Sequence, residues 1–453
     1  MNILLVHFRV GMLDGVSLEM DKWKKVLEEN LNHSVVYLAG DLGRSDGYRI
    51  PELSIEYVEA REINSLSFGN TLNKTDELAL EQKIRFNVEI IKSKLFSLLN
   101  FFSVDMMIVN NIFSFPLNIP AAIALTEVIK EKKIKTINHN HDFFWERDDY
   151  VPSCNFIRNL LEQYYPPVGT NFHQVVINSK TRDLLKEKNN VDSFCIPNVF
   201  DFQNSEWKQD NYNFDIRNDL QIDQNDIIFL QGTRIIKRKG IELIIDLIAE
   251  MNKSENLKKL MANPLYDDRI FSDTSKIVLV MPNLIEDFNY KTKIEKKCIE
   301  QNVEYRFCNE IFEHQRGRTD DNRKIYSLWD AYVIADIITY PSLLEGWGNQ
   351  FLEAVKAKKP IVMFEYSVYQ RDIGPSGFEV ISLGSTYTKD EEGLAMVSSD
   401  IIKKAAYQTI EILQEKDKFS YMADLNYQVG LKKFSLMALG DYLELLMIEF
   451  SNQ

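Results

Sequence analysis

Two glutamates and two glycines in one short segment carry the most informative chemistry of this 453-residue sequence. The segment EGWGNQFLE contains Glu345, Gly346, Gly348 and Glu353, between an apolar run and a helical pattern. A glycine-containing turn that opens a helix points backbone N–H groups at one place, which suits an anion such as a phosphate. Carboxylates beside it can accept hydrogen bonds from sugar hydroxyls. The segment therefore predicts a ligand with both phosphates and hydroxyls; the alternative is a capped helix with solvated glutamates.

A cluster of cations lies upstream of this segment. The run RIIKRKG holds Arg234, Lys237, Arg238 and Lys239 between a strand pattern and an amphipathic helix pattern. Fixed cations at such a junction can stabilise the negative charge that grows on a departing diphosphate. The alternative is a basic turn that binds no ligand.

Two histidines follow another predicted strand. His139 and His141 lie in the segment NHNHD, directly after the strand pattern of residues 135–137. In open α/β sheets, ligands bind outside the carboxyl ends of the strands, so both histidines are candidates for a binding site. A metal site formed by His139, His141 and Asp142 is a weaker alternative, because no further ligand set accompanies them.

The elements that must position these groups alternate between strand and helix, which predicts an α/β fold with parallel sheets. Strands are predicted at 2–8, 34–38, 55–58, 105–109, 135–137, 175–178, 226–231, 276–281, 304–308, 332–340 and 360–364. Helices are predicted at 17–29, 76–100, 119–131, 291–300, 322–334, 397–416, 418–425 and 436–450. Residues 60–75, 201–224 and 252–275 have no clear periodicity and are expected to be irregular.

The length, charge and composition of the chain exclude several classes of function. A chain of 453 residues is too long for one core, so at least two domains are expected. The net charge of −14 argues against nucleic acid as the main partner. The four cysteines form no CxxC pair, no signal peptide is recognised and no apolar run could span a bilayer, so we expect a cytoplasmic protein. Cations of the predicted helix 76–100 could touch a membrane surface peripherally, or they form its solvated face.

The segment from Glu345 to Glu353 resembles the nucleotide-sugar site of the retaining glycosyltransferases of family 4, which have the same spacing of two glutamates. Trp347 stands where that family more often has phenylalanine. The run from Gly232 to Gly240 is similar to its GRLxxxKG element. The segment with His141 is similar to its HD segment, with His139 as the second choice.

The resemblance implies the GT-B fold, in which two Rossmann-like domains face each other across a cleft. The sequence Cys195-Ile-Pro-Asn198 is similar to the linker that opens the second domain, although Val199 replaces its glycine. We therefore expect an N-terminal, acceptor-side domain at 1–194 and a nucleotide-sugar-binding domain at 195–435. A C-terminal helix at about 436–453 would cross back to the first domain.

The implied reaction moves a sugar from a UDP- or GDP-linked donor to a hydroxyl acceptor, with retention of configuration. No cofactor or metal is obligatory. The predicted catalytic residues are His141, Arg234, Lys239 and Glu345. The predicted donor-binding residues are Gly15, Arg234, Lys239, Gly346, Gly348, Asn349, Gln350, Phe351 and Glu353. In this scheme Lys237 and Arg238 are expected to be solvated, and an ordinary turn explains Gly11 as well as a ligand does.

Three rival functions remain open from the sequence: a disaccharide phosphorylase, a 2-epimerase, and a catalytically silent partner subunit of the same fold. The acceptor could be a small molecule, a glycan or a lipid-linked sugar. Acidic residues in the predicted acceptor loops favour a neutral acceptor, although Arg9 and Arg147 could bind an anion. These acidic residues are Asp142, Glu146, Asp148 and Asp149. The sequence does not indicate an oligomeric state.

Overall fold

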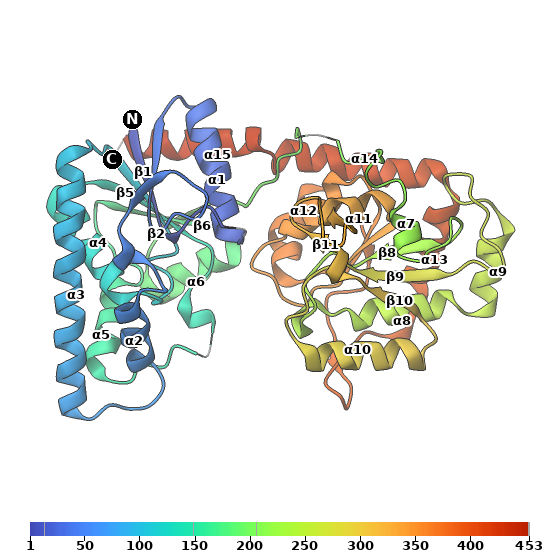
Figure 1. Ribbon diagram of the computed structural model, residues 1–453, viewed down its shortest axis with the longest axis horizontal. Coiled ribbons are helices and arrows are strands. Elements are labelled where there is room, and N and C mark those ends of the chain that lie inside the picture. Colours follow the sequence, from blue (N-terminus) through green and yellow to red (C-terminus); the bar gives the residue numbers. More distant parts are fainter. Residues whose placement is uncertain (13, 148, 205, 452–453) are drawn as a thin grey trace. The chain divides into compact units, whose positions relative to one another are not determined.

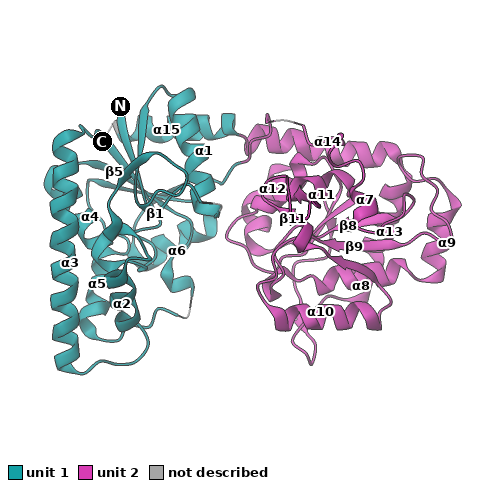
Figure 2. Cartoon of the chain, viewed as in Figure 1, with its two compact units in different colours: residues 1–199, 436–453 teal, residues 200–435 magenta. Residues whose placement is uncertain are grey.

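The chain divides into two compact units (Figure 2). A computed structural model describes residues 1–12, 14–147, 149–204 and 206–451. The first unit holds residues 1–199 and 436–453, and the second holds residues 200–435. Each is built on its own parallel sheet with helices, so the prediction of an α/β fold with two Rossmann-like parts is confirmed. The first unit extends to Val199, five residues beyond the predicted boundary at 194, because Ile196 and Val199 are buried in its apolar core.

The sheet of the first unit has seven strands in the order β3-β2-β1-β4-β5-β6-β7, and every pair is parallel. Its strands are β1 (Asn2–Arg9), β2 (Ser34–Asp41), β3 (Gly47–Arg49), β4 (Met106–Asn110), β5 (Lys135–Asn140), β6 (Phe172–Val176) and β7 (Ser193–Cys195). The order reverses between β1 and β4, which places a topological switch point at their carboxyl ends.

Helices cover both faces of this sheet (Figure 1). They are α1 (Gly15–Glu29), α2 (Val58–Ser67), α3 (Lys74–Phe101), α4 (Ile119–Lys132), α5 (Asn155–Tyr164), α6 (Ser179–Asn189) and α15 (Leu436–Ser451). Ile3 and Leu5 face α1 and α15, whereas Leu4 and Val6 face α3 and α4, as the alternation along a strand requires. The last helix thus returns the chain to the first unit, as predicted.

The second unit repeats the arrangement with a six-stranded parallel sheet of order β10-β9-β8-β14-β15-β16. Its strands are β8 (Ile227–Leu230), β9 (Ile277–Met281), β10 (Glu304–Phe307), β14 (Ile337–Tyr340), β15 (Ile361–Met363) and β16 (Ile381–Ser382). The switch point lies between β8 and β14. Smaller sheets are formed by β11 (Phe312–Glu313), β12 (Gly317–Arg318) and β13 (Lys324–Ser327), and by β17 (Thr388–Lys389) and β18 (Ala395–Met396).

The helices of the second unit pack on the same plan. They are α7 (Ile216–Asp219), α8 (Glu242–Met251), α9 (Ser254–Ala262), α10 (Phe288–Glu300), α11 (Leu328–Ile334), α12 (Asn349–Lys356), α13 (Ser399–Gln414) and α14 (Lys416–Lys433). The apolar residues of α8, α10 and α13 form one core with β8, β9 and β14, and α12 packs on α14.

Several predicted elements were wrong, each for a local reason. The run at 332–340 is the end of α11 followed by β14, because Asp336 interrupts it and accepts a hydrogen bond from Ile228 N at 2.8 Å. Likewise, the segment 322–334, predicted to be one helix, begins with strand β13. The helix starts only where Ser327 and Asp330 form a capping box. The strand predicted at 55–58 is absent from the described residues there, which form bends and the start of α2.

All three segments expected to be irregular contain helices, and α7 lies within 201–224. Helix α2 overlaps the segment 60–75 and buries Ala60, Ile63 and Ser67. Its many polar residues make this spacing hard to recognise in the sequence. Helix α9 lies within 252–275 and buries Asn256 and Leu260. These helices are short, so their patterns contain too few apolar positions to be recognised.

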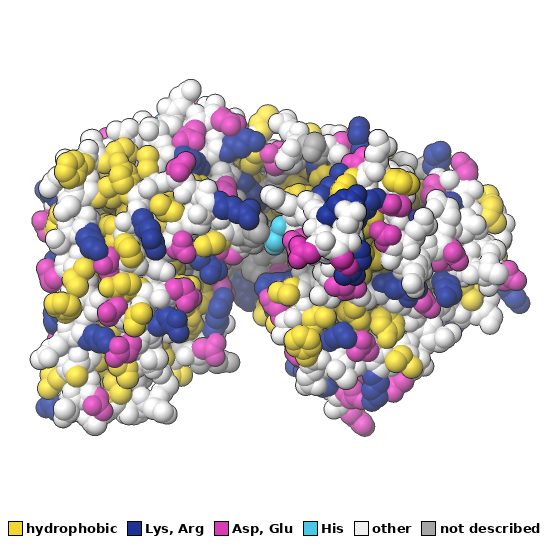
Figure 3. All heavy atoms as spheres, in the orientation of Figure 1, with side chains coloured by type: hydrophobic (Ala, Val, Ile, Leu, Met, Phe, Trp, Pro, Cys, Tyr) yellow, Lys and Arg dark blue, Asp and Glu magenta, His cyan; other side chains and the backbone are white. Residues whose placement is uncertain are grey.

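The cations of α3 pair with carboxylates of their own unit. Lys83, Arg85, Lys92 and Lys94 contact Glu62, Glu81, Glu127 and Glu52, respectively. On the face shown in Figure 3, acidic, basic and apolar side chains are interspersed along this helix. This pairing supports the solvated-face interpretation of α3. Within the described ranges, no helix has the length and apolar character needed to cross a membrane.

Candidate functional site

The predicted cations and glutamates meet at the switch point of the second unit. The loop after β8 carries Arg234 and ends in a short 3₁₀ helix, Lys237–Lys239. The loop after the neighbouring strand β14 carries Glu345 and leads into α12. Because both loops leave the carboxyl ends of adjacent parallel strands, they come together despite their separation in sequence.

A carboxylate held by two cations forms the centre of this site. Glu345 forms an ion pair with Lys239 through Oε1, and its Oε2 lies 2.7 Å from Arg238 Nη1. The side chain of Lys239 is 3% exposed and that of Glu345 is 12% exposed. Lys239 Nζ also lies 3.3 Å from Gln350 Oε1. The arrangement places two positive charges beside the amino end of α12.

Opposing effects set the pKa values of this pair. Burial raises the pKa of Glu345, but Lys239 and Arg238 outweigh burial, so that the pKa falls below its usual value. Burial lowers the pKa of Lys239, an effect that Glu345 partly offsets and Arg238 and Arg234 reinforce. Lys239 is thus a desolvated cation, and an anionic ligand nearby would stabilise its charged form.

The structure corrects one expectation about the cations. Arg238 was expected to be solvated, but it pairs with Glu345 and also donates to Leu344 O at 3.3 Å. Arg234, predicted to bind the diphosphate, pairs with Glu286, and its side chain is 45% exposed. Lys237 is exposed, as expected. The reason is tertiary: only the residues at the end of this loop reach the loop after β14.

The other predicted donor-binding residues surround the start of α12. Gly348 occupies the N-cap position, so no cap side chain competes there for the first amides of the helix. Gly346 is exposed in the preceding turn, and Asn349 is the first residue of the helix. Gln350 donates to Gly232 O at 3.3 Å. This amino terminus is suited to an anion.

Phe351 and Glu353 lie deeper in the second unit. The ring of Phe351 is fully buried and packs edge-on against Phe378 at 5.0 Å, so only its backbone could contact a ligand. Glu353 accepts a hydrogen bond from the hydroxyl of Tyr332 at 3.0 Å. The roles predicted for these residues stay predictions.

A second polar cluster lies at the switch point of the first unit. His7 near the end of β1, Asn110 at the end of β4 and His139 in β5 are buried side by side. The Nδ1 atom of His7 lies 2.7 Å from Asn110 O, and that of His139 lies 2.9 Å from Asn110 Oδ1. Because β5 extends to Asn140, His139 belongs to a strand and not to the predicted loop. It also stacks on Trp23, with ring centroids 4.2 Å apart.

His141 directly follows β5 and lies beside His139, with ring centroids 4.6 Å apart. Its backbone N–H donates to Asn111 Oδ1 at 2.8 Å. Burial, and to a smaller extent His7 and Lys22, lower the pKa of His141 to about 3. Its buried Nε2 has no hydrogen-bond partner among the described residues. A neutral imidazole with an unused nitrogen can bind a hydroxyl without adding charge.

Gly15, the remaining predicted residue, is exposed at the first position of α1. Asp14 caps this helix by accepting from the amides of Val16 and Ser17 at 3.1 and 3.0 Å. Asp14 also accepts from Arg9 Nε at 3.1 Å. Arg9 and Gly15 are thus held at the same end of the sheet as His141.

Two further observations concern the expected metal and acceptor residues. In the described parts of the chain, no three His, Cys, Asp or Glu residues gather closely enough to hold a metal ion. Asp142 pairs with Arg147 at 2.8 Å, and Glu146 accepts from the amide of Phe143 at 3.0 Å. Asp148, named in the acceptor prediction, lies outside the described residues.

Each of the two clusters includes residues that the sequence did not single out. Tyr332 and Asn110 contact predicted residues directly, and Trp23 lies behind the histidines. The only signal for Asn110 is its place at the end of a predicted strand, where ligands gather in this type of sheet. Tyr332 and Trp23 have no comparable signal, because each reaches the cluster of its own unit from a helix.

Comparison with known proteins reveals close relatives. No family model matches the sequence. A mannosylglucosylglycerate synthase of Petrotoga mobilis is 43% identical over 414 residues, covering 91% of this chain and 93% of that protein. One of Thermotoga maritima is 35% identical over 446 residues, covering 98% and 99%.

Solved structures resemble the whole chain at low sequence identity. A glycosyltransferase from Rickettsia africae has a TM-score of 0.60 at 13% identity, covering 99% of this chain and 98% of that one. A sucrose-phosphate synthase from Thermosynechococcus elongatus has a TM-score of 0.57 at 12% identity, covering 100% of both chains. These likenesses agree with the GT-B fold.

Proposed function

Because this chain belongs to the family of the mannosylglucosylglycerate synthases, which are glycosyltransferases, we propose that it transfers a mannosyl group from a nucleotide sugar to glucosylglycerate. The donor is UDP- or GDP-linked, and a hydroxyl of the acceptor takes the sugar. The observation that carries this proposal is the cluster of Lys239, Arg238 and Glu345 beside the amino end of α12.

On the donor side, the diphosphate binds Lys239, Arg238 and the first amides of α12. Arg234 joins them by exchanging Glu286 for a phosphate oxygen. The negative charge that develops on the leaving diphosphate is then stabilised by cations that are already in place. Glu345 contacts the donor sugar, and Glu353 contacts the ribose hydroxyls. No obligatory metal is needed in this scheme, because the cations meet the charge of the leaving group.

Retention follows from front-face attack of the acceptor, assisted by the leaving phosphate. Glu345 is held by two cations and has a lowered pKa, which makes it a poor covalent nucleophile. His141 contributes a neutral hydrogen-bonding group to the sugar. This role agrees with its strongly lowered pKa, since the imidazole stays uncharged at neutral pH.

Glucosylglycerate carries a carboxylate, so the acceptor in this proposal is an anion, whereas the acidic loop residues favoured a neutral one. Arg9 is the better of the two candidate anchors. Among the described residues it pairs only with Asp14, through Nε, which leaves its two Nη atoms for a bidentate contact. Arg147 instead pairs with Asp142 and lies over the ring of Phe115, 4.3 Å from its centroid.

The test combines calorimetry and kinetics on the full chain, with EDTA present and with UDP- and GDP-mannose as donors. Lys239→Met should lower affinity for the preferred donor and reduce kcat by about a hundredfold, the usual loss of one charge-stabilising group. Arg9→Met should raise KM for glucosylglycerate about tenfold and leave donor binding unchanged. Lys258→Met is the matched control, because Lys258 is exposed on α9.

The outcomes separate the rivals. A mannosylated product with retained configuration supports the proposal. Turnover driven only by free phosphate would indicate a phosphorylase, and conversion of the nucleotide sugar without an acceptor would indicate an epimerase. Unchanged behaviour of Lys239→Met, or no nucleotide binding at all, would contradict the proposal and favour a silent partner subunit.

A further inference from the structure

A cavity of about 840 Å³ in the second unit lies at the opposite end of the sheet from the candidate donor site. Asp336 and Lys359 line it; Asp336 directly precedes β14, and Lys359 lies two residues before β15. Glu345, by contrast, follows β14. The cavity therefore lies at the amino ends of strands whose carboxyl ends carry the donor site, and the proposed reaction makes no use of it.

The lining of the cavity is basic although the whole chain has a net charge of −14. Its cations are Lys208, Arg217, Arg269, Lys356, Lys358 and Lys359. Its carboxylates are Glu206, Asp267 and Asp336. This excess of cations favours an anionic ligand.

Two of the carboxylates are already neutralised within the wall. Asp336 pairs with Arg269 and accepts from the hydroxyl of Tyr266 at 2.9 Å. Asp267 lies 2.6 Å from Arg269. Asp336 also lies 3.7 Å from Arg217. The two arginines and the two carboxylates therefore compensate one another, which leaves the lysines to meet a ligand.

Lys359 has no such partner. Among the described residues, none forms a hydrogen bond or ion pair with its ammonium group, although the residue is partly buried. Burial lowers its pKa, and Arg269 and Arg217 add to this effect, while Asp336 opposes it. Its neighbour Lys358 is only weakly paired, 3.6 Å from Asp424. A bound anion would supply the missing countercharge.

Aromatic side chains, including Trp207 and Tyr332, also line the cavity. Trp207 stacks on Trp329 with ring centroids 5.7 Å apart, and Tyr332 lies 5.5 Å away. Aromatic faces of this kind suit the rings of sugars and other organic groups. The volume is also within the range of about 300–1,000 Å³ that is usual for small-molecule sites, which a lone phosphate would not fill.

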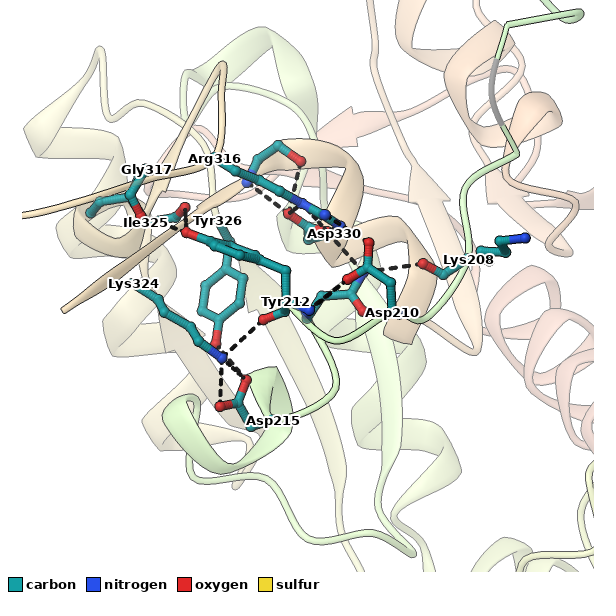
Figure 4. Close-up of polar contacts among 12 residues, drawn as sticks. Lys208, Asp210, Tyr212, Asp215, Arg316, Gly317, Lys324, Ile325, Tyr326 and Asp330 are labelled. Carbon is teal, nitrogen blue, oxygen red and sulfur yellow. Dashed lines mark hydrogen bonds and ion pairs between the residues drawn. The ribbon is translucent and has the colours of Figure 1, made fainter. Parts of the chain in front are cut away.

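The wall segment that carries Trp207 and Lys208 is anchored to the small sheet and to α11, as Figure 4 shows. Arg316 bridges Asp210, at 2.7 Å, and Asp330. Further contacts join Lys324 to Asp215 at 2.6 Å, the Tyr212 hydroxyl to Ile325 O at 2.9 Å, and Asn213 to Lys208 O at 3.2 Å. Many hydrogen bonds and ion pairs therefore hold this wall of the cavity in place.

We propose that this cavity binds an organic phosphate, with the phosphate at Lys358 and Lys359 and the organic part against Trp207. A phosphate monoester supplies the charge that the lysines lack, and its organic group fills the rest of the volume.

Tyr332 links this cavity to the donor site. Its side chain lines the cavity, and its hydroxyl donates to Glu353 at 3.0 Å. The same hydroxyl lies 2.7 Å from where a Cβ on Gly232 would stand, at the loop that carries Arg234. If a ligand that moves Tyr332 changes donor affinity, the donor changes ligand affinity by the same factor. This coupling rests on the proposed function, whereas binding in the cavity does not.

The experiment is calorimetry on the full chain with glucose 6-phosphate and, separately, inorganic phosphate. Glucose 6-phosphate should bind the wild type, Lys258→Met and Lys239→Met with the same Kd, and Lys359→Met about tenfold more weakly. Inorganic phosphate should bind more weakly than the sugar phosphate, because it lacks the group that meets Trp207. Glucose 6-phosphate should also change Trp fluorescence. Should Lys359→Met fail to fold, Lys358→Met replaces it, since Lys358 is exposed and the proposal assigns it to the same phosphate.

The contrary results are equally distinct. Equal affinity for both probes would restrict the site to free phosphate and overturn the organic ligand. No binding, or binding that Lys359→Met and Lys358→Met leave unchanged, would overturn the site itself. Loss of glucose 6-phosphate binding in Lys239→Met would place the ligand in the donor site. If the wild type binds glucose 6-phosphate but no nucleotide, only the proposed function is contradicted.

Discussion

At the scale of single residues, the contacts of Glu345 explain how Arg238 and Lys239 can lie together in a partly buried place. One carboxylate oxygen meets each cation, so the charges are compensated before any ligand binds. A donor diphosphate would bring negative charge to the same cations. In our proposal, ligand binding therefore replaces part of an existing ion pair, and Glu345 then becomes available to the donor sugar.

We predict that Glu345→Gln destabilises the ligand-free second unit by about 3 kcal/mol, because it leaves two cations without their countercharge. The preferred nucleoside diphosphate should restore that countercharge. The rise in Tm on adding it should thus be larger in the variant than in the wild type, whereas kcat should fall. Thermal unfolding with and without nucleotide measures the rise in Tm. Glu391→Gln is the control, because Glu391 is exposed. An equal rise in Tm in variant and wild type would contradict the countercharge role.

At the scale of elements, the loop after β8 can place Lys239 only because it ends in a residue with left-handed backbone. Gly240 has φ of 58°, which a glycine adopts without cost. A Cβ there would stand 2.5 Å from Pro341 O, in the loop that follows β14. The close approach of these two loops brings Lys239 to Glu345.

Gly240→Ala should lower the free energy of unfolding by at least about 2 kcal/mol, since left-handed strain and the clash with Pro341 O add together. Donor affinity should fall as well, because the two loops must separate. Urea unfolding and nucleotide calorimetry measure the two effects. Gly317→Ala is the matched control, because a Cβ there meets nothing within 4 Å. A stability loss equal to that of the control would refute this account of the loop.

At the scale of the whole molecule, the first unit contains buried histidines that the folded chain keeps neutral. Burial is the main cause, and it lowers the pKa to about 4 for His7 and to about 3 for His141. An unfolded histidine titrates near 6.5, so between these values the unfolded chain binds more protons than the folded chain. Stability therefore rises with pH in this window and is fully present above it.

We predict that the first unit loses about 2 kcal/mol of stability per such histidine when the pH falls from 7 to 5. Unfolding followed through Trp23, which stacks on His139, measures this loss. His7→Gln should reduce the slope of stability against pH, whereas His314→Gln, an exposed position in the second unit, should leave it unchanged. A slope that is the same in all three proteins would show that these histidines do not cause acid sensitivity.

Much of the fold and part of the site could be predicted because their signals are local. Buried parallel strands such as β1 and β9 appear as continuous apolar runs, and the glycine turn before α12 has a characteristic composition. Exposed or short elements were missed for the same reason: β3 is fully exposed, and α2 buries few residues. Where an acidic residue such as Asp336 interrupts an apolar run, periodicity could not locate the boundary.

The sequence by itself determined the alternation of strands and helices, the phosphate-suited turn at Gly346–Gly348 and the pool of cations near β8. Only the tertiary structure decided which cations reach Glu345, because that depends on β8 and β14 being neighbours in a sheet whose order differs from the chain order. Propensity acts over a few residues, whereas burial and ion pairing depend on distances between loops far apart in sequence. For this reason Arg238, Tyr332 and the basic cavity became visible only in the folded chain.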